Sequence, residues 1–110
     1  MLGSDYPALR VIVVDDGSKD STYEAVCEAF PRERERGLVL VLTKENSGKA
    51  EALNFGLTRV EEEIFIGIDA DTIIAPDAIS KLVDYFADPE VAAVAGNTKV
   101  GNRVNLWTRW

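Results

Sequence analysis

Two carboxylates stand one residue apart near the middle of the sequence, directly after an apolar stretch. Residues 64–68 combine β-prone apolar side chains with one glycine, which predicts a strand buried on both faces, and Asp69 and Asp71 follow it. At the carboxyl end of a parallel strand, residues i and i+2 can both turn toward the crevice where α/β sheets bind ligands. Mg²⁺ and Mn²⁺ take carboxylate oxygens and share their other positions with water and phosphate. The pattern predicts that Asp69 and Asp71 hold such a metal beside a diphosphate; the alternative is a pair of solvated loop carboxylates that cap the next helix.

Two other segments carry groups suited to the same ligand. Asp15-Asp16-Gly17-Ser18 follows a strand predicted at residues 9–14, and Gly48-Lys49 follows one predicted at residues 38–42. If the strands are parallel, all three segments lie at one edge of the sheet. One carboxylate can then bind a base or ribose, a second can hold the metal, and Lys49 can meet phosphate as a point charge. In the simpler interpretation, the first segment is only a turn and helix entry, and Lys49 is a solvated lysine.

The elements expected to position these segments alternate along the chain. Helices are predicted to begin near Asp20, at residues 46–49 and at Pro76, and a fourth strand is expected at residues 91–95. Right-handed crossovers convert this alternation of strands and helices into a mostly parallel sheet with helices on both faces. The predicted fold class is therefore α/β, with residues 1–110 in a single domain.

Two helices carry more detailed signals. Ser21 and Glu24 have the spacing of a capping box, which would satisfy backbone N–H groups at the start of the first helix. Leu53, Gly56 and Leu57 lie on the predicted inner face of the second helix. Because Gly56 has no side chain, we expect this helix to approach the sheet closely there.

Composition excludes several classes of function. The 110 residues are 46% hydrophobic and 28% charged, as expected for one soluble domain. A formal net charge of −7 argues against nonspecific binding to nucleic acid or to an anionic membrane. With no histidine and the single cysteine Cys27, this chain has no zinc site, internal disulfide, Ser-His-Asp triad or Cys-His pair. No apolar run is long enough to span a bilayer, so we expect the chain itself to be soluble.

The ordered motifs resemble those of a known family. Residues 11–22, residues 46–57 and residues 68–72 are similar to the inverting family 2 glycosyltransferases of the GT-A fold. Residues 94–97 and 99–103 resemble the membrane-bound processive synthases of chitin-like, hyaluronan and poly-N-acetylglucosamine chains. The resemblance covers nearly the whole chain. It implies a Rossmann-like nucleotide-sugar-binding fold and an enzyme that transfers a sugar from a UDP-sugar to a growing glycan.

The resemblance also implies roles for individual residues. Asp15 or Asp16 would contact the uridine, and Lys49 would lie near the nucleotide. Asp69 would lie near the ribose or phosphate, and Asp71 would bind Mg²⁺ or Mn²⁺ bridging the diphosphate. The metal offsets charge that develops on the UDP leaving group in such enzymes. The parent protein is expected at the cytoplasmic face of a membrane, with a UDP-sugar and a glycan acceptor as its partners.

The chain departs from the family pattern at both ends. The family begins with a strand bearing a Pro-x-Tyr-Asn-Glu-like sequence, and its acidic general base and Gln-x-x-Arg-Trp segment come later than residue 110. We therefore expect a partial, donor-binding half of the domain, without catalytic residues and inactive by itself. The absent strand would lie between those ending at Asp15 and Asp69. We expect these strands to pair directly, or to borrow a strand from a second copy in a homodimer.

Other classes share parts of this pattern. A phospho-acceptor receiver domain also has acidic residues after its strands, although Asp-Ala-Asp fits it poorly. A haloacid-dehalogenase-like phosphatase would use Asp69 as nucleophile and Asp71 as acid. A nucleotide-binding or structural module without catalysis is a further alternative. A P-loop is excluded, because Ser47-Gly48-Lys49 lacks the first glycine and the metal-binding hydroxyl of that motif.

Overall fold

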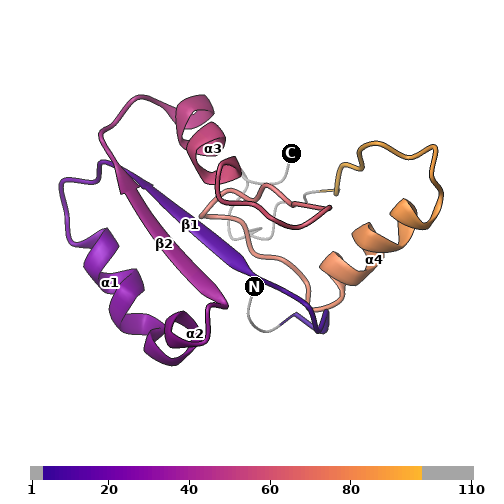
Figure 1. Cartoon of the computed structure of the whole chain (residues 1–110), viewed down its shortest axis with the longest axis horizontal. Coiled ribbons are helices and arrows are strands. Elements are labelled where there is room, and N and C mark those ends of the chain that lie inside the picture. Colours follow the sequence, from indigo (N-terminus) through magenta and orange to yellow (C-terminus); the bar gives the residue numbers. More distant parts are fainter. Residues whose placement is uncertain (1–3, 98–110) are drawn as a thin grey trace, which may run out of the picture.

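Two parallel strands form the centre of the structure. The computed structural model describes residues 4–97 of the chain. Strand β1 (Val11–Asp16) pairs with β2 (Val39–Lys44) in parallel, with Val11 opposite Val39 and Asp16 opposite Lys44 (Figure 1). Both strands are runs of β-branched and other apolar residues that end in polar ones. The strands therefore end together, and their last side chains meet at one edge.

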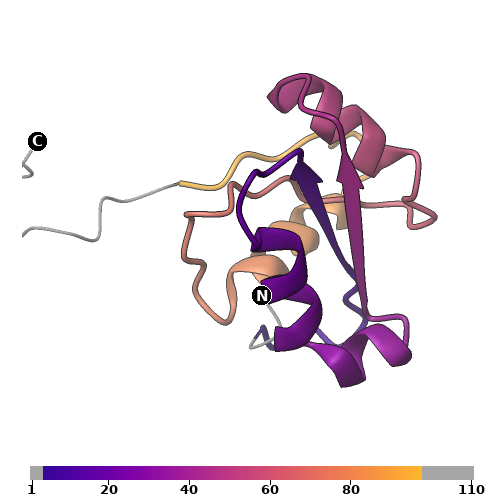
Figure 2. The same ribbon diagram turned by 90° about the vertical axis from the view of Figure 1, so that its left-hand side faces the viewer.

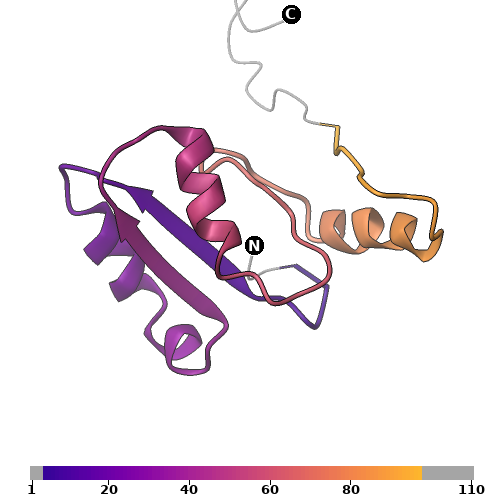
Figure 3. The same ribbon diagram turned by 45° about the horizontal axis from the view of Figure 1, so that its top comes forward.

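Helices lie on both faces of this pair. Helices α1 (Thr22–Ala29) and α2 (Pro31–Glu35) connect β1 to β2, and α3 (Lys49–Leu57) follows β2. Figure 3 shows α3 in front of the strands and α1 behind them, and Figure 2 shows the two helices from the side. The predicted α/β class, with parallel pairing and helices on both faces, is confirmed.

Helix α3 approaches β1 closely at its one buried residue, Gly56. A Cβ atom at Gly56 would lie 3.0 Å from Val14 Cγ2, closer than most real contacts. The expected close approach is therefore confirmed. Leu53 and Leu57, predicted on the same inner face, keep 49% and 39% of their surface exposed. That part of the prediction is wrong, because the strands cover only the Gly56 side of the helix.

The chain after α3 forms no further strand within the described residues. Residues 64–68 and 91–95 have no ladder hydrogen bonds, so the third and fourth strands, and the direct pairing of β1 with residues 64–68, were predicted wrongly. An apolar run becomes a strand only where a neighbouring backbone pairs with it. Pairing with a second copy stays a prediction. Helix α4 (Ala78–Asp84) and the 3₁₀ turn η1 (Tyr85–Ala87) complete the described part.

The segment before Asp69 nevertheless runs in the same direction as β1. At the amino end of β1, Arg10 Nε lies 2.7 Å from Glu62 Oε1. At the carboxyl end, Lys49 at the start of α3 contacts Asp69. The segment between Glu62 and Asp69 thus passes from one end of β1 to the other, as a parallel strand would, and it delivers Asp69 to the carboxyl edge.

The helix starts differ from their predictions in detail. Ser21 occupies the N-cap of α1 but makes no side-chain capping bond, so the capping box with Glu24 does not form. Asp20 Oδ1 instead accepts a hydrogen bond from the Thr22 N–H at 3.1 Å. Helix α4 begins at Ala78, two residues later than expected. No helix of residues 4–97 is long and apolar enough to cross a membrane. Residues 98–103, which carry part of the resemblance, lie outside the described range.

The buried core is small. Val11, Val39 and Ile79 are the buried hydrophobic residues of the described part, and Asp15 is buried with them. Val11 and Val39 are paired neighbours at the start of the two strands.

Candidate functional site

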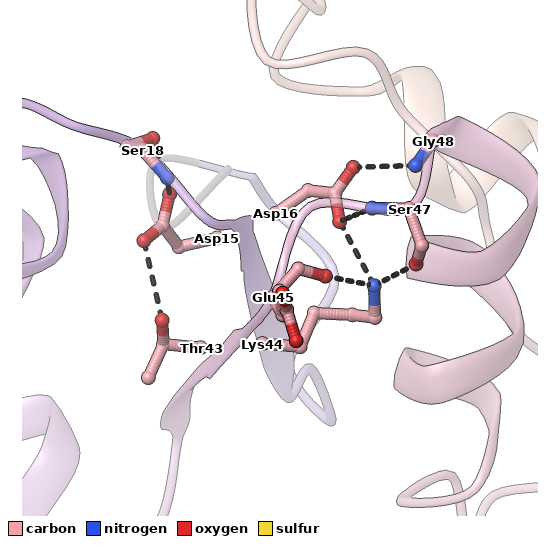
Figure 4. A network of polar contacts seen from close by, with 8 residues as sticks. All are labelled: Asp15, Asp16, Ser18, Thr43, Lys44, Glu45, Ser47 and Gly48. Atoms are coloured by element: carbon pink, nitrogen blue, oxygen red, sulfur yellow. Dashed lines mark hydrogen bonds and ion pairs between the residues drawn. The ribbon is translucent and has the colours of Figure 1, made fainter.

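The two aspartates at the end of β1 lie on opposite faces of the strand pair. Successive strand residues alternate in direction, so Asp16 shares the α3 face with Val14, and Asp15 points the other way. Asp15 is buried, with 8% of its surface exposed. Its Oδ1 accepts a hydrogen bond from the Ser18 N–H at 3.2 Å and contacts the Ser18 hydroxyl, and its Oδ2 lies 3.4 Å from Thr43 Oγ1 (Figure 4). Asp15 therefore closes the turn that leads to α1.

Asp16 binds the loop that precedes α3. Its Oδ1 accepts from Lys44 Nζ at 2.9 Å and from the Ser47 N–H at 3.1 Å, and its Oδ2 accepts from the Gly48 N–H at 3.0 Å (Figure 4). The Lys44 ammonium lowers the pKa of Asp16 below its ordinary value of 3.8; burial opposes this, and the two backbone donors reinforce it. Asp16 is thus a carboxylate held ionised by three donors.

Glycine lets the backbone pass close to this carboxylate. Gly17 has φ +70°, and a Cβ atom there would lie 2.7 Å from the Asn46 backbone nitrogen. Gly48 has φ +96°, a conformation that residues with a side chain rarely adopt. Gly17 is therefore required because the turn after β1 lies close to the loop after β2, and Gly48 is required by its backbone conformation.

The third segment is an exposed turn. The Thr72 N–H donates to the Asp69 carbonyl oxygen at 3.0 Å, which closes a turn over residues 69–72. Lys49 Nζ lies 2.5 Å from Asp69 Oδ1, with 70% and 58% of the two side chains exposed. Asp69 raises the pKa of Lys49 above its ordinary value of 10.5, and the charge of Asp71 adds to the effect. Asp71 is exposed and has no hydrogen-bond partner among residues 4–97.

Contacts connect all three predicted segments. Asp16 binds Gly48, the residue before Lys49, and Lys49 binds Asp69. Asp15 stands apart from this chain of contacts, because it faces the α1 side. The convergence expected from parallel strands therefore holds for Asp16, Lys49 and Asp69.

Lys44 and Ser47 belong to the same cluster and were not predicted. Lys44 donates to Asp16, to the Glu45 carbonyl oxygen at 2.6 Å and to the Ser47 hydroxyl. The signal that identifies Lys44 is its register: it is the last residue of β2 and the direct partner of Asp16. Register depends on the pairing of two strands, and the apolar pattern of each strand alone does not give it.

The exposed turn fits a hard divalent cation by its chemistry. Asp69 and Asp71 offer carboxylate oxygens, and magnesium sites commonly use one or two carboxylates with water and phosphate as the other ligands. Among residues 4–97, no three or more histidine, cysteine, aspartate or glutamate side chains are grouped so that they could hold a metal ion. Lys49 places a positive charge beside Asp69.

Comparison with known proteins identifies the family. The family model described as "Glycosyl transferase family 2" matches residues 1–110. The chain belongs to this family. It is 33% identical over 107 residues to the poly-beta-1,6-N-acetyl-D-glucosamine synthase of Staphylococcus epidermidis, and 32% identical to that of Staphylococcus aureus strain COL. Each alignment covers 96% of this chain and 25% of the relative, so the chain spans about a quarter of their length.

Family membership confirms the class of enzyme to which the sequence was assigned, a glycosyltransferase of family 2. The parallel strand pair with its helices fits a partial GT-A fold of that family. The match over the full chain favours this family over the receiver-domain and phosphatase alternatives. No solved structure matches the chain significantly.

Proposed function

We propose that this chain forms the donor-binding part of a metal-dependent, inverting glycosyltransferase that transfers a sugar from a UDP-sugar to a growing glycan. The observation that carries the proposal is the series of contacts from Asp16 through Gly48 and Lys49 to Asp69. It brings a carboxylate, a lysine and an acidic turn to the edge where open α/β sheets bind ligands. The names of the relatives favour N-acetylglucosamine as the sugar.

Each residue has a role in this proposal. Lys49, at the first position of α3, offers its ammonium group to the diphosphate from an exposed position. Asp69 and Asp71 hold Mg²⁺ or Mn²⁺, which when bound neutralises negative charge on the departing UDP. Asp16, and Asp15 on the other face, shape the turn against which the uridine lies. The glycan acceptor and a position at the cytoplasmic face of a membrane complete the proposal for the whole protein.

Lys49 has a second partner in this scheme. In the structure its ammonium group binds Asp69. A diphosphate carries more negative charge than one carboxylate, so we expect Lys49 to move toward it and release Asp69 Oδ1 for the metal. Ligand binding would then replace an exposed ion pair by a set of metal and phosphate contacts.

An NMR titration of the purified chain with UDP tests the proposal. With Mg²⁺ present, we expect amide shifts to cluster at residues 15–18, 47–49 and 69–72. Mn²⁺ should broaden residues 69–72 selectively, which locates the metal. Asp71→Ala should abolish the metal dependence, and Asp84→Ala, an exposed aspartate on α4, is the matched control.

The outcomes separate two parts of the proposal. If UDP binds without any dependence on metal, the metal role of Asp69 and Asp71 is wrong and the nucleotide role stands. If neither UDP nor UDP-N-acetylglucosamine binds with metal present, the donor-site proposal is wrong. Tighter binding of UDP-N-acetylglucosamine than of UDP-glucose would support the sugar named by the relatives.

A further inference from the structure

Lys44 is unusually well bonded for a lysine at the end of a strand. Lysine side chains are mostly solvated, yet 17% of the Lys44 side chain is exposed. A lysine ammonium has three N–H donors, and here it contacts three acceptors: Asp16 Oδ1, the Glu45 carbonyl oxygen and the Ser47 hydroxyl (Figure 4). Its donor capacity is therefore filled within its own cluster.

The partners of Lys44 belong to two parts of the chain that lie far apart in sequence. Asp16 ends β1, whereas Glu45 and Ser47 lie in the loop between β2 and α3. Asp16 itself accepts from the Ser47 and Gly48 N–H groups of that loop. Lys44 thus binds the Glu45 carbonyl oxygen and the Ser47 hydroxyl of the loop, and Asp16 binds its backbone N–H groups.

The loop leads directly to the proposed phosphate-binding lysine. Gly48 is the N-cap of α3, and Lys49 is the first residue of the helix. Fixing Gly48 therefore fixes the starting point of the Lys49 side chain, which reaches 2.5 Å from Asp69. The loop also runs close beside the turn after β1, where a Cβ atom at Gly17 would lie 2.7 Å from the Asn46 nitrogen.

We propose that Lys44 is a positioning residue of the donor site: by holding Asp16 on Ser47 and Gly48, it fixes the loop over residues 45–48 and so places Lys49 against the turn over residues 69–72. The inference rests on the proposed donor-binding function for the meaning of that placement. Lys44 touches no ligand in this scheme, because its three donors are engaged inside the cluster.

The hydrogen bond from Lys44 acts on the Asp16 carboxylate more strongly than either backbone donor does. Among the groups that lower the pKa of Asp16, Lys44 has the largest effect, ahead of the Ser47 and Gly48 N–H groups. Without the ammonium, Asp16 would be a half-buried carboxylate with no counter-charge, and burial disfavours such a group. We expect Asp16 then to turn toward water and to release the two N–H groups.

The test compares Lys44→Met, Lys44→Arg and the control Lys81→Met in the purified chain. Lys81 also pairs with an aspartate, Asp77 at 2.6 Å, but that pair lies on the surface of one helix. The readouts are amide hydrogen exchange at residues 47–49, the carboxyl pKa of Asp16 by carbon NMR, and the affinity for UDP with Mg²⁺.

Lys44→Met should raise the Asp16 pKa and speed amide exchange at Ser47 and Gly48. It should also weaken the affinity for UDP about tenfold, which is the size of the effect expected from the loss of one charge-assisted hydrogen bond. Lys44→Arg keeps the positive charge, so each of the three readouts should stay close to its wild-type value. Lys81→Met should change none of the three readouts. If Lys44→Met does not fold, Ser47→Ala replaces it: this variant removes one Lys44 acceptor and should still speed the exchange of Gly48.

The results distinguish failure of this inference from failure of the donor-site function. If the wild-type chain binds UDP and Lys44→Met binds it equally well, with unchanged exchange at Ser47 and Gly48, the positioning role is overturned and the function stands. In the Ser47→Ala arm, unchanged exchange at Gly48 overturns it likewise. If the wild-type chain binds no UDP, both proposals are overturned.

Discussion

Among residues 4–97, two lysine–aspartate pairs lie at the same edge of the strands, and they differ in how much of the protein surrounds them. Lys44 and Asp16 are half-buried, and their contacts extend to Glu45, Ser47 and Gly48. Lys49 and Asp69 are exposed and are joined by one hydrogen-bonded ion pair. Exposed ion pairs contribute little to stability, whereas charge-assisted bonds within a network fix geometry. We call Lys44–Asp16 the built pair, because surrounding residues hold it in place, and Lys49–Asp69 the exposed pair.

The largest expected effect comes from breaking the close approach beside the built pair. Gly17→Ala places a Cβ atom 2.7 Å from the Asn46 nitrogen at a positive φ, so we expect a loss of roughly 2–5 kcal/mol in the free energy of unfolding. Gly37→Ala is the matched control: its φ is +72° and its Cβ would meet nothing, so roughly 1–2 kcal/mol is expected. Urea unfolding of both variants measures the difference. Equal losses would mean that the Gly17 contact has no energetic consequence.

The second-largest effect is expected at low pH, where protonation of Asp16 should weaken the built pair. The pKa of Asp16 is lowered in the folded protein, so its contribution to stability is present above the unfolded value near 3.8 and is lost as the pH falls through the folded value. Asp16→Asn should therefore lose less stability than the wild type as the pH falls below the ordinary carboxyl pKa of 3.8. Asp77→Asn is the control, because its pKa is lowered by Lys81 in an exposed pair. Thermal unfolding across this pH range checks the expectation, and identical acid profiles for Asp16→Asn and Asp77→Asn would contradict it.

Within the built pair, the sequence predicted Asp16 as a site residue but did not predict Lys44. Strands β1 and β2 were predicted, because their runs of β-branched and other apolar residues carry their own signal. That Asp15 and Asp16 face opposite sides follows from the period of a strand alone. Lys44 was not predicted, because its partner depends on how two strands align, and Asp16 opposite Lys44 is a property of the pair.

Two other predictions from local sequence patterns differ from the structure. The capping box at Ser21 and Glu24 had the correct spacing, but Ser21 makes no side-chain capping bond, and Asp20 Oδ1 accepts a hydrogen bond from the Thr22 N–H at the first position of α1. Residues 64–68 had the composition of a strand but find no paired backbone among the described residues. Their direction along β1 was nevertheless predicted, and it is direction that brings Asp69 to Lys49.

Salt should separate the two pairs. At about 1 M salt the screening length falls to roughly 3 Å, which weakens exposed ion pairs more than half-buried ones. We therefore expect the raised pKa of Lys49 to return most of the way to 10.5, while the pKa of Asp16 stays below 3.8. Side-chain NMR titrations at low and high salt measure both groups in one sample. An equal response of the two groups to salt would remove the distinction between a built and an exposed pair.

The smallest effect on stability is expected where α3 packs against β1, at Gly56 and Val14. Gly56→Ala adds a Cβ atom 3.0 Å from Val14 Cγ2, a packing cost that opposes the gain of about 1 kcal/mol from replacing glycine inside a helix. The net change in unfolding free energy should lie within about 1 kcal/mol of zero. Gly67→Ala, with open space around its Cβ, is the control. If the added methyl group displaces α3, exchange at Ser47 and Gly48 should rise even though overall stability hardly changes. Unchanged exchange would mean that the loop is held by Asp16 and Lys44 independently of how α3 packs.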